Sequence, residues 1–188
     1  MADSESVESS SLPNSPCMAT ERKEIISKPS LQVKVAVIGS GAFGTALATV
    51  SARAGNNVFL YARKESVVLA INETRHNPNY LTEFELEPNI TAVHSIAHAL
   101  EGACLVILCL PCQCLPDWIR ENAHLIDPTS LLVNTAKGLY LRDECLLSEA
   151  IEKALGRVQP FCVLSGPSFA KEIMLGFPTA VVVASKVT

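Results

Sequence analysis

The sequence predicts a doubly wound α/β domain built on a parallel sheet, and three observations support this. Apolar runs of strand length alternate with helical segments from Gln32 onward. These runs are apolar at nearly every position, which is typical of strands that helices cover on both faces. Glycine or polar turns separate the segments. A parallel sheet with crossover helices satisfies all three observations.

The first strand is expected at 33–38, a β-branched run that ends at glycine. The first helix is expected at 42–54, because Gly55 then occupies a natural C′ position. The further strands are expected at 58–61, 105–110, 131–134, 161–164 and 179–184. The further helices are expected at 65–74, 95–100, after Pro111, 144–155 and 170–175. Asn and Pro interrupt any period in 75–81, which predicts a loop there.

Composition and charge narrow the class of protein. Of the 188 residues 48% are hydrophobic, and the mean hydropathy is +0.27, which is enough for a buried core. The net charge is −4 with no long basic run, so nucleic acid is not an expected partner. No apolar run approaches the ~20 residues of a membrane-spanning helix, so no membrane partner is expected either.

The first 31 residues differ from the rest of the chain. They are rich in Ser, Pro and acidic residues without hydrophobic periodicity, which predicts a disordered tail before a domain at 32–188. Acidic residues argue against an organelle transit peptide, whereas the Ser content fits one. We therefore expect a cytoplasmic protein, with the plastid as the alternative.

The cysteines favour a reducing compartment, because several of the seven lie inside apolar runs and no secretory signal is expected. Cys109, Cys112 and Cys114 form a C-x-x-C-x-C cluster that could serve redox or metal chemistry. A zinc site needs a fourth ligand, and neither a second Cys pair nor a nearby His supplies it. No metal site is therefore expected.

The segment GSGAFG, from Gly39 to Gly44, matches G-x-G-x-x-G and lies between an expected strand and an expected helix. That context is what the dinucleotide-binding fingerprint requires, and it predicts a Rossmann domain. Gly39 permits the tight turn, Gly41 lets the backbone approach a pyrophosphate, and Gly44 lets the helix pack on the strand. The alternative is a plain strand–helix turn.

The second strand ends near Arg63 and Lys64, where an NAD-selective site usually has Asp or Glu for the ribose 2′-hydroxyl. Arg63 could accommodate a 2′-phosphate instead, which would permit NADP. The alternative is that both side chains extend into solvent. The cofactor is therefore expected to be NAD or NADP.

Two later loops place polar residues at the carboxyl ends of expected strands, where open α/β sheets bind ligands. Lys137 follows the strand at 131–134 and could hold a phosphate or polarise a carbonyl. Gly166, Ser168 and Lys171 follow the strand at 161–164, and Gly166 and Ser168 could donate to an anion. Taken alone, each loop could be an ordinary capped surface turn.

Four segments in this order and spacing resemble NAD(P)-dependent glycerol-3-phosphate dehydrogenase of the bacterial and plant plastid type. They are GSGAFGTALA, HNPNYL, NTAKGL and LSGPSFAKEI followed by PTAVVVAS. The resemblance runs from about Val33 to Lys186. It implies reversible hydride transfer between nicotinamide and dihydroxyacetone phosphate, giving sn-glycerol 3-phosphate for glycerolipid synthesis.

The resemblance also implies roles for single residues. Lys137, Gly166 and Ser168 are expected to bind the substrate. The expected cofactor-binding residues, which include the whole glycine loop, are Gly39, Ser40, Gly41, Ala42, Phe43, Gly44, Arg63, Pro111, Lys137 and Ala170.

In the resembled family a helical domain follows, and it carries the general-acid lysine and most phosphate-binding groups. The final expected strand runs on to Thr188. We therefore expect this chain to be the cofactor-binding half of such an enzyme, without a catalytic residue. A homodimer would form through the helical domain. The alternatives are a non-catalytic dinucleotide-binding module and a truncated isoform that pairs with full-length subunits. A 6-phosphogluconate or 2-hydroxyacid dehydrogenase fits less well, because of the GPSFAKE segment.

Overall fold

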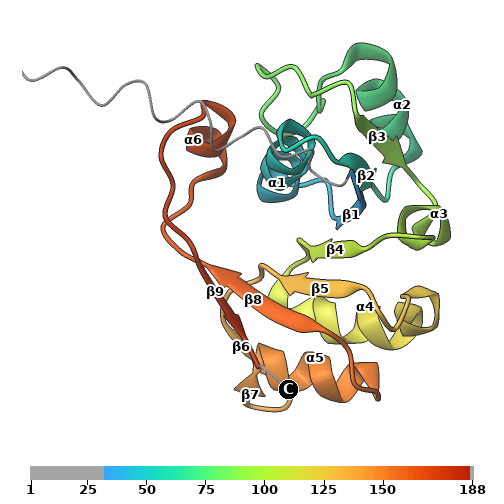
Figure 1. Cartoon of the computed structure of the whole chain (residues 1–188), viewed down its shortest axis with the longest axis vertical. Coiled ribbons are helices and arrows are strands. Elements are labelled where there is room, and N and C mark those ends of the chain that lie inside the picture. Colours follow the sequence, from blue (N-terminus) through green and yellow to red (C-terminus); the bar gives the residue numbers. More distant parts are fainter. Residues whose placement is uncertain (1–31, 187–188) are drawn as a thin grey trace, which may run out of the picture. The chain divides into compact units, whose positions relative to one another are not determined.

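A computed structural model describes residues 32–186. The predicted disordered tail at 1–31 lies outside the described residues. The described part forms one seven-stranded sheet in the order β3-β2-β1-β4-β5-β8-β9, with helices on both faces (Figure 1). The strands are β1 Lys34–Ile38, β2 Asn57–Tyr61, β3 Ile90–Val93, β4 Leu105–Leu108, β5 Leu131–Asn134, β8 Phe161–Ser165 and β9 Val182–Ser185.

Every pairing from β3 across to β8 is parallel, so the predicted doubly wound parallel sheet is confirmed. The strand order reverses between β1 and β4, which is where such folds bind ligands. One strand departs from the prediction: β9 pairs antiparallel to β8 at the sheet edge. The connection through the short helix α6 turns the chain back on itself instead of crossing over the sheet.

The helices match the expected segments closely. They are α1 Ala42–Arg53, α2 Glu65–Thr74, α3 Ile96–Leu100, α4 Leu115–Asn122, α5 Leu147–Leu155 and α6 Ala170–Met174, with 3-10 turns at η2 Cys112–Cys114 and η3 Ala123–Leu125. A small hairpin of β6 Leu139–Tyr140 and β7 Cys145–Leu146 precedes α5. No helix among residues 32–186 is long and apolar enough to cross a membrane.

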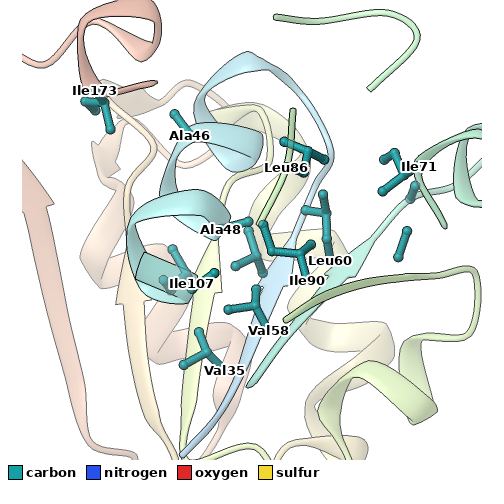
Figure 2. Close-up of a cluster of buried hydrophobic side chains, with 14 of the residues drawn as sticks. Val35, Ala46, Ala48, Val58, Leu60, Ile71, Leu86, Ile90, Ile107 and Ile173 are labelled. Carbon is teal, nitrogen blue, oxygen red and sulfur yellow. The ribbon is translucent and has the colours of Figure 1, made fainter. Parts of the chain in front are cut away.

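Strand β1 shows how the sheet separates two hydrophobic layers. Val35 and Val37 contribute to the cluster that includes residues of α1, α2 and α6, whereas Ala36 and Ile38 contribute to the cluster under α3, α4 and α5. Figure 2 shows Ala46 and Ala48 of α1 over side chains of the sheet in the first layer. The small alanine side chains let α1 approach the sheet closely. Each fully buried Val or Ile side chain contributes about 1.5–3 kcal/mol to the stability of the fold.

Four expectations about the elements were incomplete, and one concerns β9, which begins at Val182 and not at 179. Strand β3 was not predicted, because Ile-Thr-Ala-Val is short and carries a polar, exposed Thr91. Helix α5 begins at Leu147 and not at 144, because Cys145–Leu146 pairs with the hairpin partner and Glu144 has a positive φ of 49°. Strand β4 ends at Leu108, two residues early, where the chain turns toward the glycine loop.

Candidate functional site

Two glycines of the segment Gly39–Gly44 allow β1, α1 and β4 to meet at one point. Gly39 has a φ of +115°, and a Cβ there would lie 2.6 Å from the carbonyl oxygen of Cys109. A Cβ on Gly44 would lie 1.9 Å from the carbonyl oxygen of Gly39 and 3.2 Å from the Cβ of Cys109. Neither position can hold a side chain without moving backbone, so both glycines serve the packing of helix on sheet.

Gly41 serves a different purpose, because a Cβ added there would have no neighbour within 4 Å among the described residues. It is the N-cap of α1, with no side-chain cap and no acidic residue in the first turn. The amide groups and the positive pole of α1 are thus available to an anion. This combination of open space and uncapped amides fits a diphosphate group.

A cavity of about 630 Å³ opens at this point, between the carboxyl ends of β1 and β4. The expected cofactor residues that line it are Gly39, Ser40, Gly41, Ala42, Phe43, Gly44, Arg63 and Pro111. Lys137 and Ala170, which were also expected to contact the cofactor, are not among the lining residues. Ala170 instead packs against the first core cluster.

Half of the residues in the cavity wall were not predicted from the sequence. The additional lining residues are Tyr61, Tyr80, Cys109, Leu110, Cys114, Trp118, Thr135 and Ala136. Several directly end or follow a parallel strand, and the rule that ligands bind at these ends would have found them. Tyr80 and Trp118 had no such signal, because they come from a loop and from helix α4.

A second cavity of about 390 Å³ adjoins the first and shares Ser40, Arg63 and Tyr80 with it. Its other lining residues are Lys64, Val67 and Asn79. Arg63 and Lys64 are exposed, and neither forms an ion pair within the part of the chain that the structure describes. Two cations without an ion pair among the described residues therefore line the second cavity, and Arg63 lines the first as well.

Burial disfavours the thiolate form of two cysteines in the C-x-x-C-x-C cluster near the first cavity. Burial raises the pKa of the Cys109 thiol to about 11, against the opposing effect of a hydrogen bond from Thr135 Oγ1 at 3.4 Å. Burial also raises the pKa of Cys112. Among residues 32–186 no group of three potential ligands could hold a metal ion.

The three expected substrate residues lie together at the ends of β5 and β8. The carbonyl oxygen of Gly166 accepts hydrogen bonds from Lys137 Nζ at 3.1 Å and from Ser168 Oγ at 3.4 Å. Lys137 is exposed, whereas Gly166 and Ser168 are half-buried. Lys171, the second lysine of this region, pairs with Glu83 at 2.9 Å.

Residues 34–188 match a family model described as the N-terminus of NAD-dependent glycerol-3-phosphate dehydrogenase. The chain belongs to this family. A glycerol-3-phosphate dehydrogenase [NAD(P)+] of Brucella canis is 40% identical over 154 residues, which cover 82% of this chain and 47% of the relative. The corresponding enzyme of Desulfovibrio desulfuricans is 38% identical over 155 residues, covering 82% and 46%.

Solved structures of glycerol-3-phosphate dehydrogenases share the fold. The enzyme from Coxiella burnetii superposes with a TM-score of 0.77 at 31% identity, covering 83% of this chain and 47% of that chain. The enzyme from Saccharomyces cerevisiae gives 0.75 at 25% identity, covering 84% and 48%. The chain thus spans about half the length of the family members it matches.

Proposed function

We propose that this chain is the dinucleotide-binding part of an NAD(P)-dependent glycerol-3-phosphate dehydrogenase. The whole enzyme would interconvert dihydroxyacetone phosphate and sn-glycerol 3-phosphate, the precursor of glycerolipids. The observation that carries the proposal is the open, uncapped start of α1 at Gly41, inside a cavity at the point where the strand order reverses. Membership of the family supplies the reaction.

The nicotinamide cofactor, when bound, supplies or accepts the hydride. The residues of this chain would hold it in a defined orientation. The amides at the start of α1 would bind its diphosphate, and Arg63 would meet its adenosine ribose. Pro111 and the apolar wall formed with Leu110 and Trp118 would exclude water from one side of the cavity.

The second cavity supports NADP as a substrate beside NAD. Arg63 and Lys64 place two positive charges beside the expected ribose position, where NAD-selective domains have a carboxylate that would repel a 2′-phosphate. Arg63 can bind a phosphate with two parallel N–H groups, which Lys64 cannot.

Lys137, Gly166 and Ser168 would form the substrate side of the site. The Lys137 ammonium group already lies at hydrogen-bond distance from the Gly166 loop, so it can neutralise a phosphate or polarise a ketone held there. Lys137→Ala in a full-length family member should raise the Michaelis constant about tenfold, consistent with loss of one charge-assisted hydrogen bond. An unchanged Michaelis constant and rate would place Lys137 outside the substrate site.

The direct test uses the single tryptophan of the chain, Trp118, which lines the cavity. Titration of the purified 188-residue chain with NADH and NADPH should quench its fluorescence and transfer energy to the reduced nicotinamide. Calorimetry should give the same dissociation constants. Absence of heat and of energy transfer with both nucleotides would refute the proposed function.

Addition of dihydroxyacetone phosphate to the nucleotide-loaded chain distinguishes two hypotheses, part of a dehydrogenase and a non-catalytic dinucleotide-binding module. We expect binding with negligible turnover by these 188 residues, because the resemblance places the general acid in the half of the relatives that the match does not cover. Robust turnover would contradict that expectation and leave the enzymatic function standing. Binding, with turnover after mixing with a full-length relative no higher than that of the relative alone, would favour the alternative, a non-catalytic dinucleotide-binding module.

Partner and location are also part of the proposal. The reaction calls for a small phosphorylated ketone and for no nucleic acid or membrane. A homodimer through a helical domain, and a cytoplasmic location with the plastid as alternative, follow from the resemblance and from the composition of residues 1–31. Size-exclusion chromatography with light scattering and a fluorescent fusion of the full coding sequence would check them.

A further inference from the structure

The side chain of Asn77 lies fully buried between the glycine loop and the loop that follows α2. Its amide nitrogen donates to the carbonyl oxygen of Ser40 at 3.0 Å and to Thr45 Oγ1 at 2.9 Å. Its amide oxygen accepts from the backbone N–H groups of Asn79 at 3.0 Å and Tyr80 at 3.2 Å. Both donor hydrogens and two acceptor positions of this one side chain are therefore in use.

The two ends of this bridge belong to different parts of the nucleotide site. Ser40 lies between two glycines of the loop, and Thr45 is fully buried on the second turn of α1. Asn79 and Tyr80 line the second cavity, and Tyr80 also lines the first. Asn77 itself lines neither cavity, so it acts on the site through its neighbours.

Such a bridge matters because it ties a glycine-rich loop to an irregular segment that is distant in sequence. A loop with glycines at 39, 41 and 44 loses much conformational entropy when a ligand fixes it. The segment after α2 is irregular, and Arg75 and Leu81 at its two ends have φ values of 59° and 56°. Fixing both segments before binding removes that cost from the binding free energy.

We propose that Asn77 is a positioning residue for dinucleotide binding: it holds the glycine loop in its binding conformation and places Tyr80 against it. This inference rests on the proposed function, because the ligand it serves is the dinucleotide. The bridge fixes the site that both nucleotides share, so its loss should weaken NADH and NADPH alike.

The chain offers a matched control in Asn89. Its amide nitrogen also donates two hydrogen bonds to the α1 region, to the carbonyl oxygens of Ala52 at 2.8 Å and Asn56 at 2.7 Å. These bonds lie at the far end of α1, and Asn89 lines neither cavity. Asn77→Ala removes four side-chain hydrogen bonds, two of them donated to the start of the α1 region, and Asn89→Ala removes two at the other end of the same helix.

The experiment measures dissociation constants for NADH and NADPH, by calorimetry, on the folded 188-residue chain and its variants, together with the midpoint of thermal unfolding. Asn77→Ala should weaken both nucleotides about tenfold. Asn89→Ala should lower the unfolding midpoint and leave both constants within twofold. Equal constants for Asn77→Ala and the unchanged chain, or an equal loss in Asn89→Ala, would overturn the inference.

A second variant keeps the test decisive if Asn77→Ala does not fold. Thr45→Val keeps the shape of the side chain and removes only the oxygen that accepts from Asn77, so it should weaken both nucleotides about threefold. No change in Thr45→Val would then overturn the inference. If the unchanged chain binds neither nucleotide, it is the proposed function that fails, whatever the variants do.

Discussion

Strands β1 and β9 have similar sequences and opposite surroundings. In β1, Val35 to Ile38 are fully buried, whereas in β9 every residue is exposed, Val182 by 69% and Val183 by 58%. Strand β1 has parallel neighbours on both sides and helices on both faces. Strand β9 is antiparallel, and β8 is its single partner among residues 32–186. An apolar run therefore predicts a strand, but its position in the sheet determines its burial.

The same contrast separates the two regions proposed to bind ligands. The loop after β1 is packed against β4 and opens into a cavity with walls from several elements. The loop after β8 holds Gly166 and Ser168 beside exposed apolar residues, among them Phe169 and Phe177. Dinucleotide binding can thus be tested on this chain alone, whereas the loop proposed to bind the substrate offers an anion few enclosing walls among the described residues.

The largest effect is expected from Gly44→Ala, in the packed region formed by β1, the loop Gly39–Gly44 and α1. Its Cβ would overlap the carbonyl oxygen of Gly39, at 1.9 Å, so helix α1 must move away from the sheet. We expect a loss of about 3 kcal/mol or more in the free energy of unfolding, as for severe overpacking. Urea unfolding followed by circular dichroism measures it, and nucleotide binding should be lost together with stability.

Gly41→Val is the control for this prediction, because the new side chain enters open space in the same loop. Its unfolding free energy should fall by no more than about 1 kcal/mol, the cost of a poor N-cap residue at an unpacked site. The valine would fill space that a diphosphate needs, so both nucleotides should bind at least tenfold more weakly. Unchanged binding in Gly41→Val would show that the anion does not use this space.

The next largest effect concerns pH and Cys109, whose pKa is raised to about 11 by burial beside the glycine loop. The neutral thiol is favoured in the folded state, while the unfolded thiol ionises at about pH 8.5. The contribution of the neutral Cys109 thiol to the free energy of unfolding is complete below about pH 8.5 and is lost as the pH rises through 11. The loss should reach about 3 kcal/mol, on the order of 1.4 kcal/mol for each pH unit between the two pKa values.

Cys109→Ala isolates the contribution of this thiol to the pH dependence of the free energy of unfolding. Unfolding free energies at pH 8 and at pH 10.5 should fall less steeply in the variant than in the unchanged chain. Cys104→Ala, at an exposed cysteine, should keep the original slope. Parallel slopes for Cys109→Ala and the unchanged chain would show that the thiol is not protected from ionisation.

A smaller effect should come from Arg63→Ala, at the exposed rim of the packed site. Removal of the guanidinium should weaken NADPH about tenfold and NADH less than twofold, because the 2′-phosphate alone needs the charge. Lys153→Ala, at an exposed lysine that pairs with Asp143, should change neither constant. Equal losses for both nucleotides would contradict a phosphate-binding role for Arg63.

The region of β1, the glycine loop and α1 could be predicted well from the sequence, because the sequence patterns that mark it are local. The glycine spacing, the β-branched run of β1 and the alanine-rich helix α1 all lie within about twenty residues, and each reports on its neighbour in space. Arg63 could be placed because the second strand of such folds ends beside the glycine loop. The boundaries of α2 and β5 were also predicted to the residue.

The remaining features depend on contacts between segments far apart in the chain. Asn77 meets Ser40 and Thr45 across more than thirty residues, and nothing local marks an Asn in a loop as a bridge. The direction of β9 depends on how α6 turns the chain. The residues Tyr80 and Trp118 reach the cavity from irregular or helical segments, for which no strand-end rule applies.

The smallest effect should come from the exposed strand, and it tests the comparison between β1 and β9 directly. Val183→Thr in β9 should change the free energy of unfolding by less than about 0.5 kcal/mol, because water already reaches the side chain and Thr is equally suited to a strand. Val37→Thr in β1 makes the same chemical change at a fully buried site, where the hydroxyl loses its hydrogen bonds to water. That variant should cost about 1–3 kcal/mol. Equal losses at the two positions, measured by urea unfolding, would mean that β9 is covered in solution and that the difference in burial between the two strands is not real.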